Sequence, residues 1–375
     1  MKKIFATIIL GLVGMFSLPA IAAEPIKIAA IFAKTGIAAK DNAPNLEGVR
    51  FAVEEINGQG GLLGRKLEVI ELDNGSNSIG SKQAALKAVE LDVVAVIGAA
   101  WSSHSLAIAP VLQQAQIPMI SPISTNPKVT LIGNFIFRVC FIDPFQGEVM
   151  ARFAYRDLKA RTAIILTNVN SDFSIGLAEF FKKTFIQSGG KVLWEGEYKE
   201  KAIDFSTTLK KVRLLQPNVV FLPGYIQDSA LIIKQAKKME IRSIFIGGDG
   251  WSGDRMYEYG GKAIEGGYYS QHWHSKVPFH RSQQLQANYH RKYGTKILPG
   301  VLPTAYDAVM VLADAIRRAQ SLKHKKIRDT LADTKNFQGA TGTITFDENG
   351  DPVNKDAAIL KFENGTSVYV KTIKP

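Results

Sequence analysis

The chain has 375 residues, enough for two domains of ordinary size, and 46% of them are hydrophobic. Its formal net charge is +12 at pH 7, but the basic residues are scattered and no groove-reading motif accompanies them, which argues against nucleic-acid binding. Its single cysteine, Cys140, excludes an internal disulfide framework, so we expect a buried apolar cysteine in a fold that rests on core packing.

The first residues have the pattern of a secretory signal peptide. Lys2 and Lys3 form a basic start, residues 4–18 are apolar, and residues 20–23 offer the small side chains of a cleavage site. The apolar segment is shorter than the ~20 residues that span a bilayer, and no later segment is long and apolar enough. No cysteine lies at the cleavage point, which argues against a lipid anchor. We therefore expect residues 1–23 to be removed and the mature protein to be periplasmic.

After this leader, short apolar runs alternate with segments of helical periodicity. The runs predict strands over residues 26–33, 67–72, 93–99, 119–122 and 134–139, and the periodicity predicts helices over residues 45–57 and 81–91 and a third that starts near residue 102. Strands that alternate with helices in this way are typical of a parallel sheet with helices on both faces.

The same alternation begins again after Asp143 and Pro144. It predicts helices over residues 146–158, 175–188, 205–215 and 229–239, and strands over residues 163–167, 192–198, 219–222 and 244–247. Further helices follow over residues 278–293, 303–318 and 327–332, and turn-punctuated strands over residues 342–346, 357–362 and 367–372. The fold class is therefore α/β, with two doubly wound parallel-sheet lobes.

Hydroxyl side chains follow two neighbouring strands of the first lobe. Ser102 and Ser103 follow the strand over residues 93–99, and either can cap the next helix; Ser124 and Thr125 follow the strand over residues 119–122. Because the ends of parallel strands meet at one edge, these hydroxyls and the free amides of the helix start should share a crevice. Such a crevice can hold a small carboxylate, although ordinary loop serines and a helix cap give the same spacing.

Two further patterns point away from cofactors and metals. The glycine-rich loop over residues 58–64 follows a helix and precedes a strand, which is the wrong context for a nucleotide site and typical of a helix end with a tight turn. Four histidines lie between residues 272 and 290, but no cysteine and no spaced carboxylate completes a metal site. We expect neither a cofactor nor a metal. His104 either contacts the crevice or lies solvated in the first helical turn.

Two residues mark the corresponding edge of the second lobe. Tyr225 follows a strand in FLPGY, and Asp249 follows another in FIGGDGW. Open α/β sheets bind ligands at these carboxyl ends of their strands. A partly buried surface tyrosine and a turn aspartate remain the alternatives.

Taken together, the motifs resemble a known family. The segments are IGAAWSSHS, IPMISPISTNPKVT, FAVEEINGQGGLLGRKLEVIELDN, FRVCFIDPFQG, FLPGY and FIGGDGW, and they are similar to the periplasmic leucine/isoleucine/valine-binding proteins, the type I solute-binding proteins of ABC importers. The resemblance covers essentially the whole mature chain. It implies lobe 1 at residues 24–143 with 272–351 and lobe 2 at residues 144–271 with 352–375, joined by a three-strand hinge that closes on a ligand.

The resemblance also implies how a zwitterion would be held. The Asp249 carboxylate would face the ligand's α-ammonium, while Ser102, Thr125 and neighbouring main-chain groups would hold its charged ends. Tyr225 would contact the ligand from the second lobe, with Phe173 packed nearby. The predicted ligand-binding residues are Trp101, Ser102, Ile123, Ser124, Thr125, Phe173, Tyr225, Asp249 and Trp251.

Departures from the family pattern leave the ligand open. Asp249 stands where relatives usually carry a glutamate, and Trp101 and Trp251 stand where smaller residues are common. We expect a branched-chain or other apolar amino acid as ligand, an ABC permease of the inner membrane as partner, and a monomer. The more aromatic pocket also suits an aromatic acid or amide, taken up or sensed. An exported α/β enzyme is the third alternative; it would need a nucleophile with a base, or a metal, and the sequence offers neither.

Overall fold

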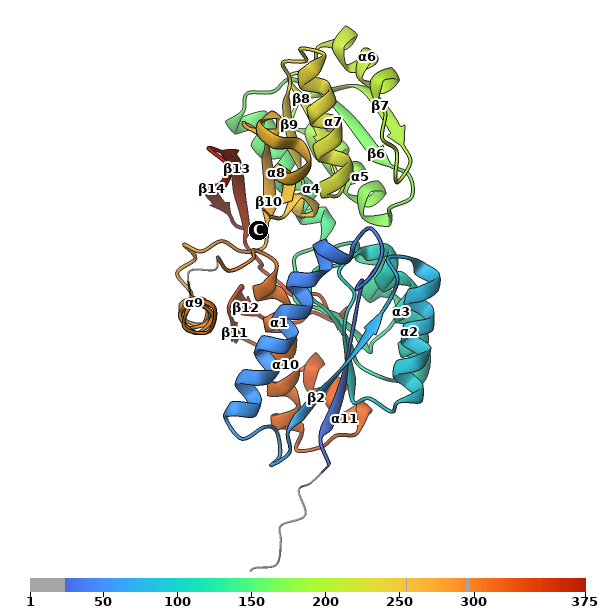
Figure 1. Cartoon of the computed structure of the whole chain (residues 1–375), viewed down its shortest axis with the longest axis vertical. Helices are drawn as coiled ribbons and strands as arrows, with labels where there is room; N and C mark the ends of the chain where they lie inside the picture. The colour runs from blue at the N-terminus through green and yellow to red at the C-terminus, as the bar shows by residue number, and fades with distance from the viewer. Residues whose placement is uncertain (1–23, 254, 295–296) are drawn as a thin grey trace, which may run out of the picture.

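The computed structural model describes residues 24–253, 255–294 and 297–375. These residues form two lobes stacked along the long axis of the molecule (Figure 1). The predicted signal peptide, residues 1–23, lies outside the described residues. Within the described ranges, no helix has both the length and the apolar character needed to cross a bilayer.

The first lobe is built on a five-stranded parallel sheet with the order β2-β1-β3-β4-β5. The strands are β1 (Ile26–Phe32), β2 (Leu67–Asp73), β3 (Ala95–Gly98), β4 (Met119–Ser121) and β5 (Ile136–Arg138), and the helices between them are α1 (Ala39–Gly58), α2 (Ser78–Glu90), α3 (Ser102–Ala115) and the 3₁₀ helix η1 (Pro127–Ile132). The strand order reverses between β1 and β3, and crevices for ligands form at such a point. The starts of α1 and α3 flank this crevice.

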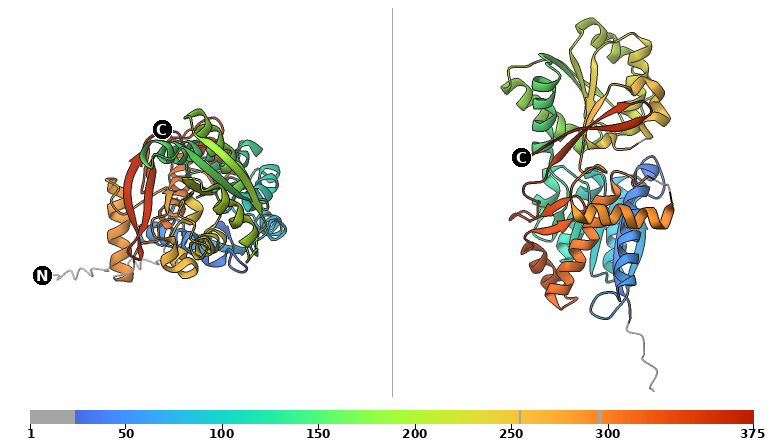
Figure 2. Two further views of the ribbon diagram at one scale, coloured as in Figure 1. Left: turned by 90° about the horizontal axis from the view of Figure 1, so that it is seen from above. Right: turned by 90° about the vertical axis from the view of Figure 1, so that its left-hand side faces the viewer.

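The second lobe is built on a seven-stranded sheet with the order β14-β13-β10-β9-β8-β6-β7. The strands are β6 (Thr162–Asn168), β7 (Lys191–Tyr198), β8 (Val219–Leu222), β9 (Ile244–Gly247), β10 (Tyr268–Gln271), β13 (Ala357–Glu363) and β14 (Thr366–Ile373). β6 to β10 are parallel, whereas β13 and β14 run antiparallel along one edge. Figure 2 shows this red hairpin beside the junction of the two lobes. The predicted parallel sheet therefore carries an antiparallel edge.

Helices cover the second sheet, and the remaining elements pack on the first lobe. Those of the second lobe are α4 (Asp143–Arg152), the π-helical turn η2 (Phe153–Asp157), α5 (Asp172–Gln187), α6 (Ser206–Leu215), α7 (Ile226–Lys238), η3 (Asp249–Trp251), α8 (Arg255–Gly260) and η4 (Gly261–Ile264). Those on the first lobe are α9 (His280–Tyr293), α10 (Leu302–Ala319), α11 (His324–Ala332) and the antiparallel pair β11 (Phe337–Gly339) and β12 (Gly342–Ile344).

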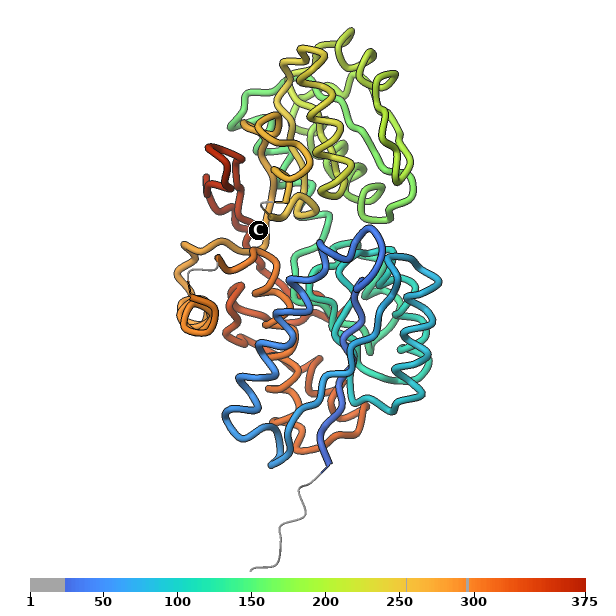
Figure 3. Tube along the Cα trace, in the orientation of Figure 1, coloured from blue at the N-terminus to red at the C-terminus, as the bar shows by residue number. Residues whose placement is uncertain are grey.

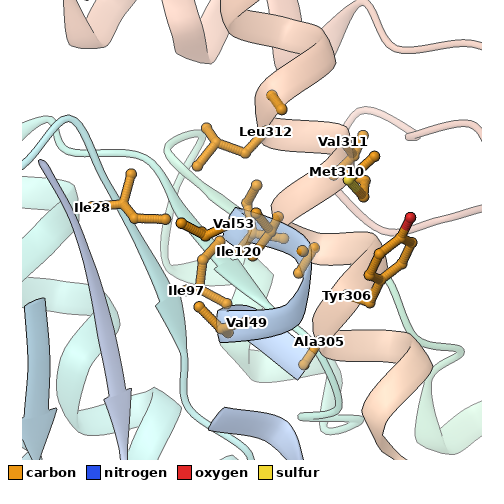
Figure 4. Packing of buried hydrophobic residues seen from close by; sticks show 14 of the residues in the cluster. Ile28, Val49, Val53, Ile97, Ile120, Ala305, Tyr306, Met310, Val311 and Leu312 are labelled. Carbon is orange, nitrogen blue, oxygen red and sulfur yellow. The ribbon is translucent and has the colours of Figure 1, made fainter. Parts of the chain in front are cut away.

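Close packing of α1 against α10 orients the start of α1 toward the cleft. A Cβ atom at Gly48 would lie 2.6 Å from the carbonyl oxygen of Leu302, so only glycine allows the two helices to approach this closely. Val49 and Val53 of α1 join the same buried cluster as residues of α10 and of the sheet strands (Figure 4). The pair is thus part of the main core of the first lobe.

The structure differs from the sequence prediction at the beginning of α1. The helix starts at Ala39, whereas the periodicity predicts a start at residue 45. Pro44 lies inside the helix, and proline has no amide hydrogen for the helical hydrogen bond. The signal of the first turn is therefore weak in the sequence. This turn brings polar side chains to the cleft that the sequence did not single out.

The chain passes between the lobes after β5, after β10 and after β12 (Figure 3). Arg138, which is fully buried, connects the first and third of these passages. Its Nε atom lies 2.5 Å from Oδ1 of Asp351, and its other nitrogens donate to the Thr130 hydroxyl at 2.7 Å and to the carbonyl oxygens of Ser124 and Asn126. One guanidinium therefore fixes both the hinge region and the loop that follows β4.

Candidate functional site

A cavity of about 460 Å³, its mouth included, lies between the lobes. Its first-lobe wall comes from the starts of α1 and α3 and from the loop after β4, and its second-lobe wall from the starts of α5 and α7 and the turn after β9. The carboxyl ends of both sheets therefore face it, as the motif positions predict. The predicted site residues that line it are Trp101, Ser102, Ile123, Thr125, Phe173, Tyr225 and Asp249.

The two other predicted site residues do not line this cavity, and their prediction is corrected. The Ser124 hydroxyl is buried and lies 2.7 Å from the Ser105 hydroxyl and 3.1 Å from the carbonyl oxygen of Ala99, so it fixes the loop. Trp251 is fully buried, and its ring stacks on Phe362 in the second-lobe core. The short turn η3 directs Asp249 to the cavity and turns Trp251 away from it.

The start of α3 offers hydrogen-bond donors, although it is not capped as predicted. Trp101 is the extended N-cap residue and makes no side-chain cap. The Ser102 hydroxyl accepts from the amide of Asn126 at 3.2 Å, and the Ser103 hydroxyl accepts from the amide of Asp172 at 3.0 Å. In the part of the chain that the structure describes, the amides of His104 and Ser105 donate to the carbonyl oxygen of Trp101, whereas those of Ser102 and Ser103 have no acceptor. A helix start with free amides favours an anion.

Thr125 presents a hydroxyl at the same wall. Its side chain is buried, and the hydroxyl lies beside the Asp143 carboxyl without a hydrogen bond of good geometry. The Thr125 carbonyl accepts from the amide of Asp143 at 2.9 Å, so the backbone is held while the hydroxyl remains available. A buried hydroxyl without a well-formed hydrogen bond is unfavourable, and it has one donor and two acceptor positions, so this group is a candidate for hydrogen bonding to a ligand.

The Asp249 carboxylate lies on the opposite wall, buried and oriented by two side chains. Oδ1 accepts from Nε2 of Gln146 at 2.7 Å, and Oδ2 lies 3.0 Å from Nε2 of His272. A carboxylate has about four acceptor positions, so two bonds leave room for a ligand ammonium. Gln146 and His272 have no recognisable sequence signal, because they reach Asp249 from distant parts of the chain.

A stack of aromatic rings connects the two lobes at the cavity. The Tyr225 ring lies between Trp101, with centroids 3.9 Å apart, and Phe173, with centroids 5.4 Å apart. Trp101 belongs to the first lobe, whereas the other two rings belong to the second. Trp101 and Tyr225 also line a second cavity of about 440 Å³, together with Glu200 and Lys201. The stacked pair therefore forms a shared wall between an inner and an outer cavity.

Polar contacts bridge the lobes around the stack. Arg255 of α8 forms an ion pair with Asp41 of α1. The Asn126 side-chain amide donates to the carbonyl oxygen of Asp172 at 2.7 Å, next to the Ser103 contact with the same residue. The lobes are thus held together on more than one side of the cavity, as in a hinged protein whose cleft has closed.

Comparison with known proteins identifies the family. The family model described as periplasmic binding protein matches residues 25–367. This chain belongs to the periplasmic binding protein family. It is similar to a leucine-binding protein from Thermotoga maritima, with a TM-score of 0.89 and 37% identity over 93% of this chain and 99% of that one.

Two further relatives are similar over nearly their whole length. A branched-chain amino acid transporter substrate-binding protein from Streptococcus pneumoniae, solved in complex with isoleucine, has a TM-score of 0.88 and 27% identity over 94% of this chain and 100% of that one. The leucine-, isoleucine-, valine-, threonine- and alanine-binding protein of Pseudomonas aeruginosa is 28% identical over 99% of this chain and 98% of its own. The type I fold predicted for this periplasmic binding protein is confirmed.

Two of the four clustered histidines of this periplasmic binding protein, His272 and His274, each contact another side chain. His272 is bonded to Asp249, and the His274 ring stacks on Tyr369 with centroids 3.9 Å apart. Over the described ranges, no three His, Cys, Asp or Glu side chains are grouped as a metal site requires. His104 is buried behind Trp101, with ring centroids 5.3 Å apart, and its Nδ1 lies 3.2 Å from Nδ2 of Asn74. The expectation of a solvated His104 is therefore wrong.

The buried His104 makes the stability of this periplasmic binding protein depend on pH. Burial lowers the pKa of His104 from its ordinary value of 6.5 to about 4. Between these values the unfolded chain binds a proton that the folded chain does not, so the free energy of unfolding should fall by up to about 3 kcal/mol as the pH falls from 6.5 to 4. Urea denaturation of wild type and His104→Gln at several pH values in this range measures the free energy of unfolding. We expect this free energy to fall more steeply with falling pH in wild type than in His104→Gln. An equal pH dependence in the two proteins would contradict the prediction.

Removing the Trp101 ring should weaken ligand binding by this periplasmic binding protein. In Trp101→Ala the inner and outer cavities merge, and both the shared wall and the stack with Tyr225 are lost. We expect the dissociation constant of the bound ligand to rise about tenfold, which isothermal titration calorimetry measures. Trp101→Phe keeps a ring and should retain most of the affinity. Equal affinities of wild type and Trp101→Ala would show that the wall does not contribute.

Proposed function

We propose that the protein is exported, captures an α-amino acid between its lobes and delivers it to an ABC permease of the inner membrane. One observation carries this proposal: the cavity has hydrogen-bond donors on its first-lobe wall and a buried carboxylate on its second-lobe wall. The α3 amides and the Thr125 hydroxyl suit a ligand carboxylate, and Asp249 suits an ammonium. Each end of a zwitterion then has a partner, without which its burial would be costly.

Capture follows from the hinge between the lobes. The first lobe, residues 24–143 with 272–351, binds the ligand first, and the second lobe, residues 144–271 with 352–375, closes Tyr225 and Asp249 over it. The protein acts as a monomer, and the ligand leaves unchanged. The leucine and isoleucine named for its relatives make branched-chain amino acids the first ligands to test.

A thermal-shift screen of the ligand-stripped protein tests the proposal. The panel contains the common amino acids, short amides and benzoate-type acids. A ligand at 100 times its dissociation constant adds about 2.7 kcal/mol to the stability, which gives an easily measured shift. We expect an α-amino acid to give the largest shift. Mass spectrometry after incubation should recover that ligand intact, whereas a reaction product would indicate an enzyme.

The aromatic stack favours a second candidate, a binder of an aromatic acid or amide. Trp101, Tyr225 and Phe173 give the cavity an aromatic, largely apolar wall, and a ligand without an amine would not need Asp249. In the same screen, this candidate requires that only aromatic acids or amides shift the transition. Their affinity should then survive the loss of the Asp249 carboxylate.

A further inference from the structure

Three polar side chains at the start of α1 line the inner cavity and have no part in binding a zwitterion. These are Asp41, Asn42 and Asn45, on a different element from the groups assigned to the ligand's charged ends. Asp41 is paired with Arg255. The two asparagines are therefore the polar groups of this helix whose contribution to binding is still unexplained.

Both asparagine side chains are buried and incompletely paired. Asn42 is 1% exposed and Asn45 is 2% exposed. Oδ1 of Asn42 accepts from the amide of Ala33 at 3.1 Å, but Nδ2 of Asn42 and Oδ1 of Asn45 have no hydrogen-bond partner among the described residues. Buried polar atoms in folded proteins are normally paired. Two such atoms at the wall of a binding cavity indicate a ligand that pairs with them.

The two unpaired atoms are a donor and an acceptor on residues three apart in the same helix. Residues three apart in a helix are neighbours on one face, so Asn42 and Asn45 present Nδ2–H and Oδ1 to the same region. An aliphatic ligand side chain would leave both atoms unpaired. A carboxamide has both complements, because its oxygen can accept from Asn42 while its amino group donates to Asn45.

We propose that the ligands of this protein include α-amino acids with a carboxamide side chain, bound through Asn42 and Asn45. The proposal rests on the proposed function, in which Asp249 and the α3 amides hold the charged ends of the ligand. Asparagine and leucine provide the matched pair of ligands for a test, since their side chains have nearly the same shape and differ in polarity. In a wholly apolar pocket, leucine would bind far more tightly than asparagine.

The test is calorimetric titration of the ligand-stripped protein with asparagine and with leucine. Wild type should bind asparagine at least as tightly as leucine. Asn45→Leu replaces the polar group with a side chain of the same shape, and it should change the ratio of the two affinities about tenfold or more in favour of leucine. Asn349→Leu, in an exposed turn that does not line the cavity, should leave the ratio unchanged.

A second variant covers the case in which Asn45→Leu does not fold. Asn42→Asp keeps an acceptor for the amide of Ala33 and removes the donor, so it should change the ratio in the same direction. The inference is overturned if wild type binds asparagine more than tenfold more weakly than leucine, or if folded variants leave the ratio unchanged; the proposed function then stands. If no α-amino acid binds wild type, the proposed function itself fails.

Discussion

Replacement of Asp249 with alanine is expected to weaken the binding of an α-amino acid about 100-fold or more. The ligand ammonium would remain buried without its carboxylate, and the loss of one partner from a buried charge pair is among the largest effects that a single substitution produces. Gln146 and His272 would lose their common acceptor in the same variant. Calorimetric titration with leucine measures the change.

Two controls separate the charge of Asp249 from its shape. Asp249→Asn keeps the size of the side chain and removes its charge, so it should lose nearly as much affinity for leucine. The analogue of leucine that lacks the amine, 4-methylpentanoate, should bind wild type and Asp249→Ala with similar affinities. If Asp249→Ala bound leucine as wild type does, the carboxylate would not be the ammonium partner, and the aromatic-acid candidate would take precedence.

Replacement of Arg138 with methionine is expected to lower the free energy of unfolding by about 3–5 kcal/mol. Arg138 is fully buried and holds Asp351, the Thr130 hydroxyl and the carbonyl oxygens of Ser124 and Asn126. The variant leaves these acceptors without their donor in the protein interior. Urea denaturation monitored by tryptophan fluorescence measures the loss.

Two controls test whether burial makes the Arg138 pair important. One is an exposed ion pair, and the other is a double variant that removes both charges of the buried pair. Lys325 lies 3.0 Å from Asp329, but its side chain is 74% exposed, so Lys325→Met should change the free energy of unfolding by less than about 1 kcal/mol. The double variant Arg138→Met, Asp351→Asn also removes the carboxylate that would be buried without its partner, so it should recover part of the lost free energy of unfolding. Equal effects of Arg138→Met and Lys325→Met would mean that the buried pair does not stabilise the hinge.

Local patterns were sufficient to locate most residues that line the cavity between the lobes. Ser102, Thr125, Tyr225 and Asp249 each follow the end of a buried strand, and parallel strands bring such ends to one edge, so their convergence follows from chain order alone. The alternation of strands and helices likewise predicts both lobes. The antiparallel edge formed by β13 and β14 was the main feature of the sheets that this alternation did not predict.

The rest of the site depends on contacts that no local pattern contains. Gln146 meets Asp249 across 103 positions of the chain, because a helix start and a strand end converge only in the folded lobe. Asn42 was missed because Pro44 weakens the helical signal before residue 45, and Asn45, although inside the predicted helix, faces the cavity only because of how the folded lobe packs. Trp251 was wrongly predicted to line the cavity. It lies only two residues after Asp249, and within the short turn η3 the first side chain faces the cavity and the last faces the core.

The bridges between the lobes determine how fast a captured ligand can be exchanged. When the Arg255–Asp41 pair and the Asn126–Asp172 hydrogen bond open, the second-lobe wall separates from the first and a bound molecule loses its contacts with one of the two walls. Stronger bridges should therefore slow the dissociation of every ligand that both walls hold, whatever its side chain. A membrane partner that pulls the lobes apart accelerates release without contacting the ligand, so a single transport machine can serve ligands with different side chains.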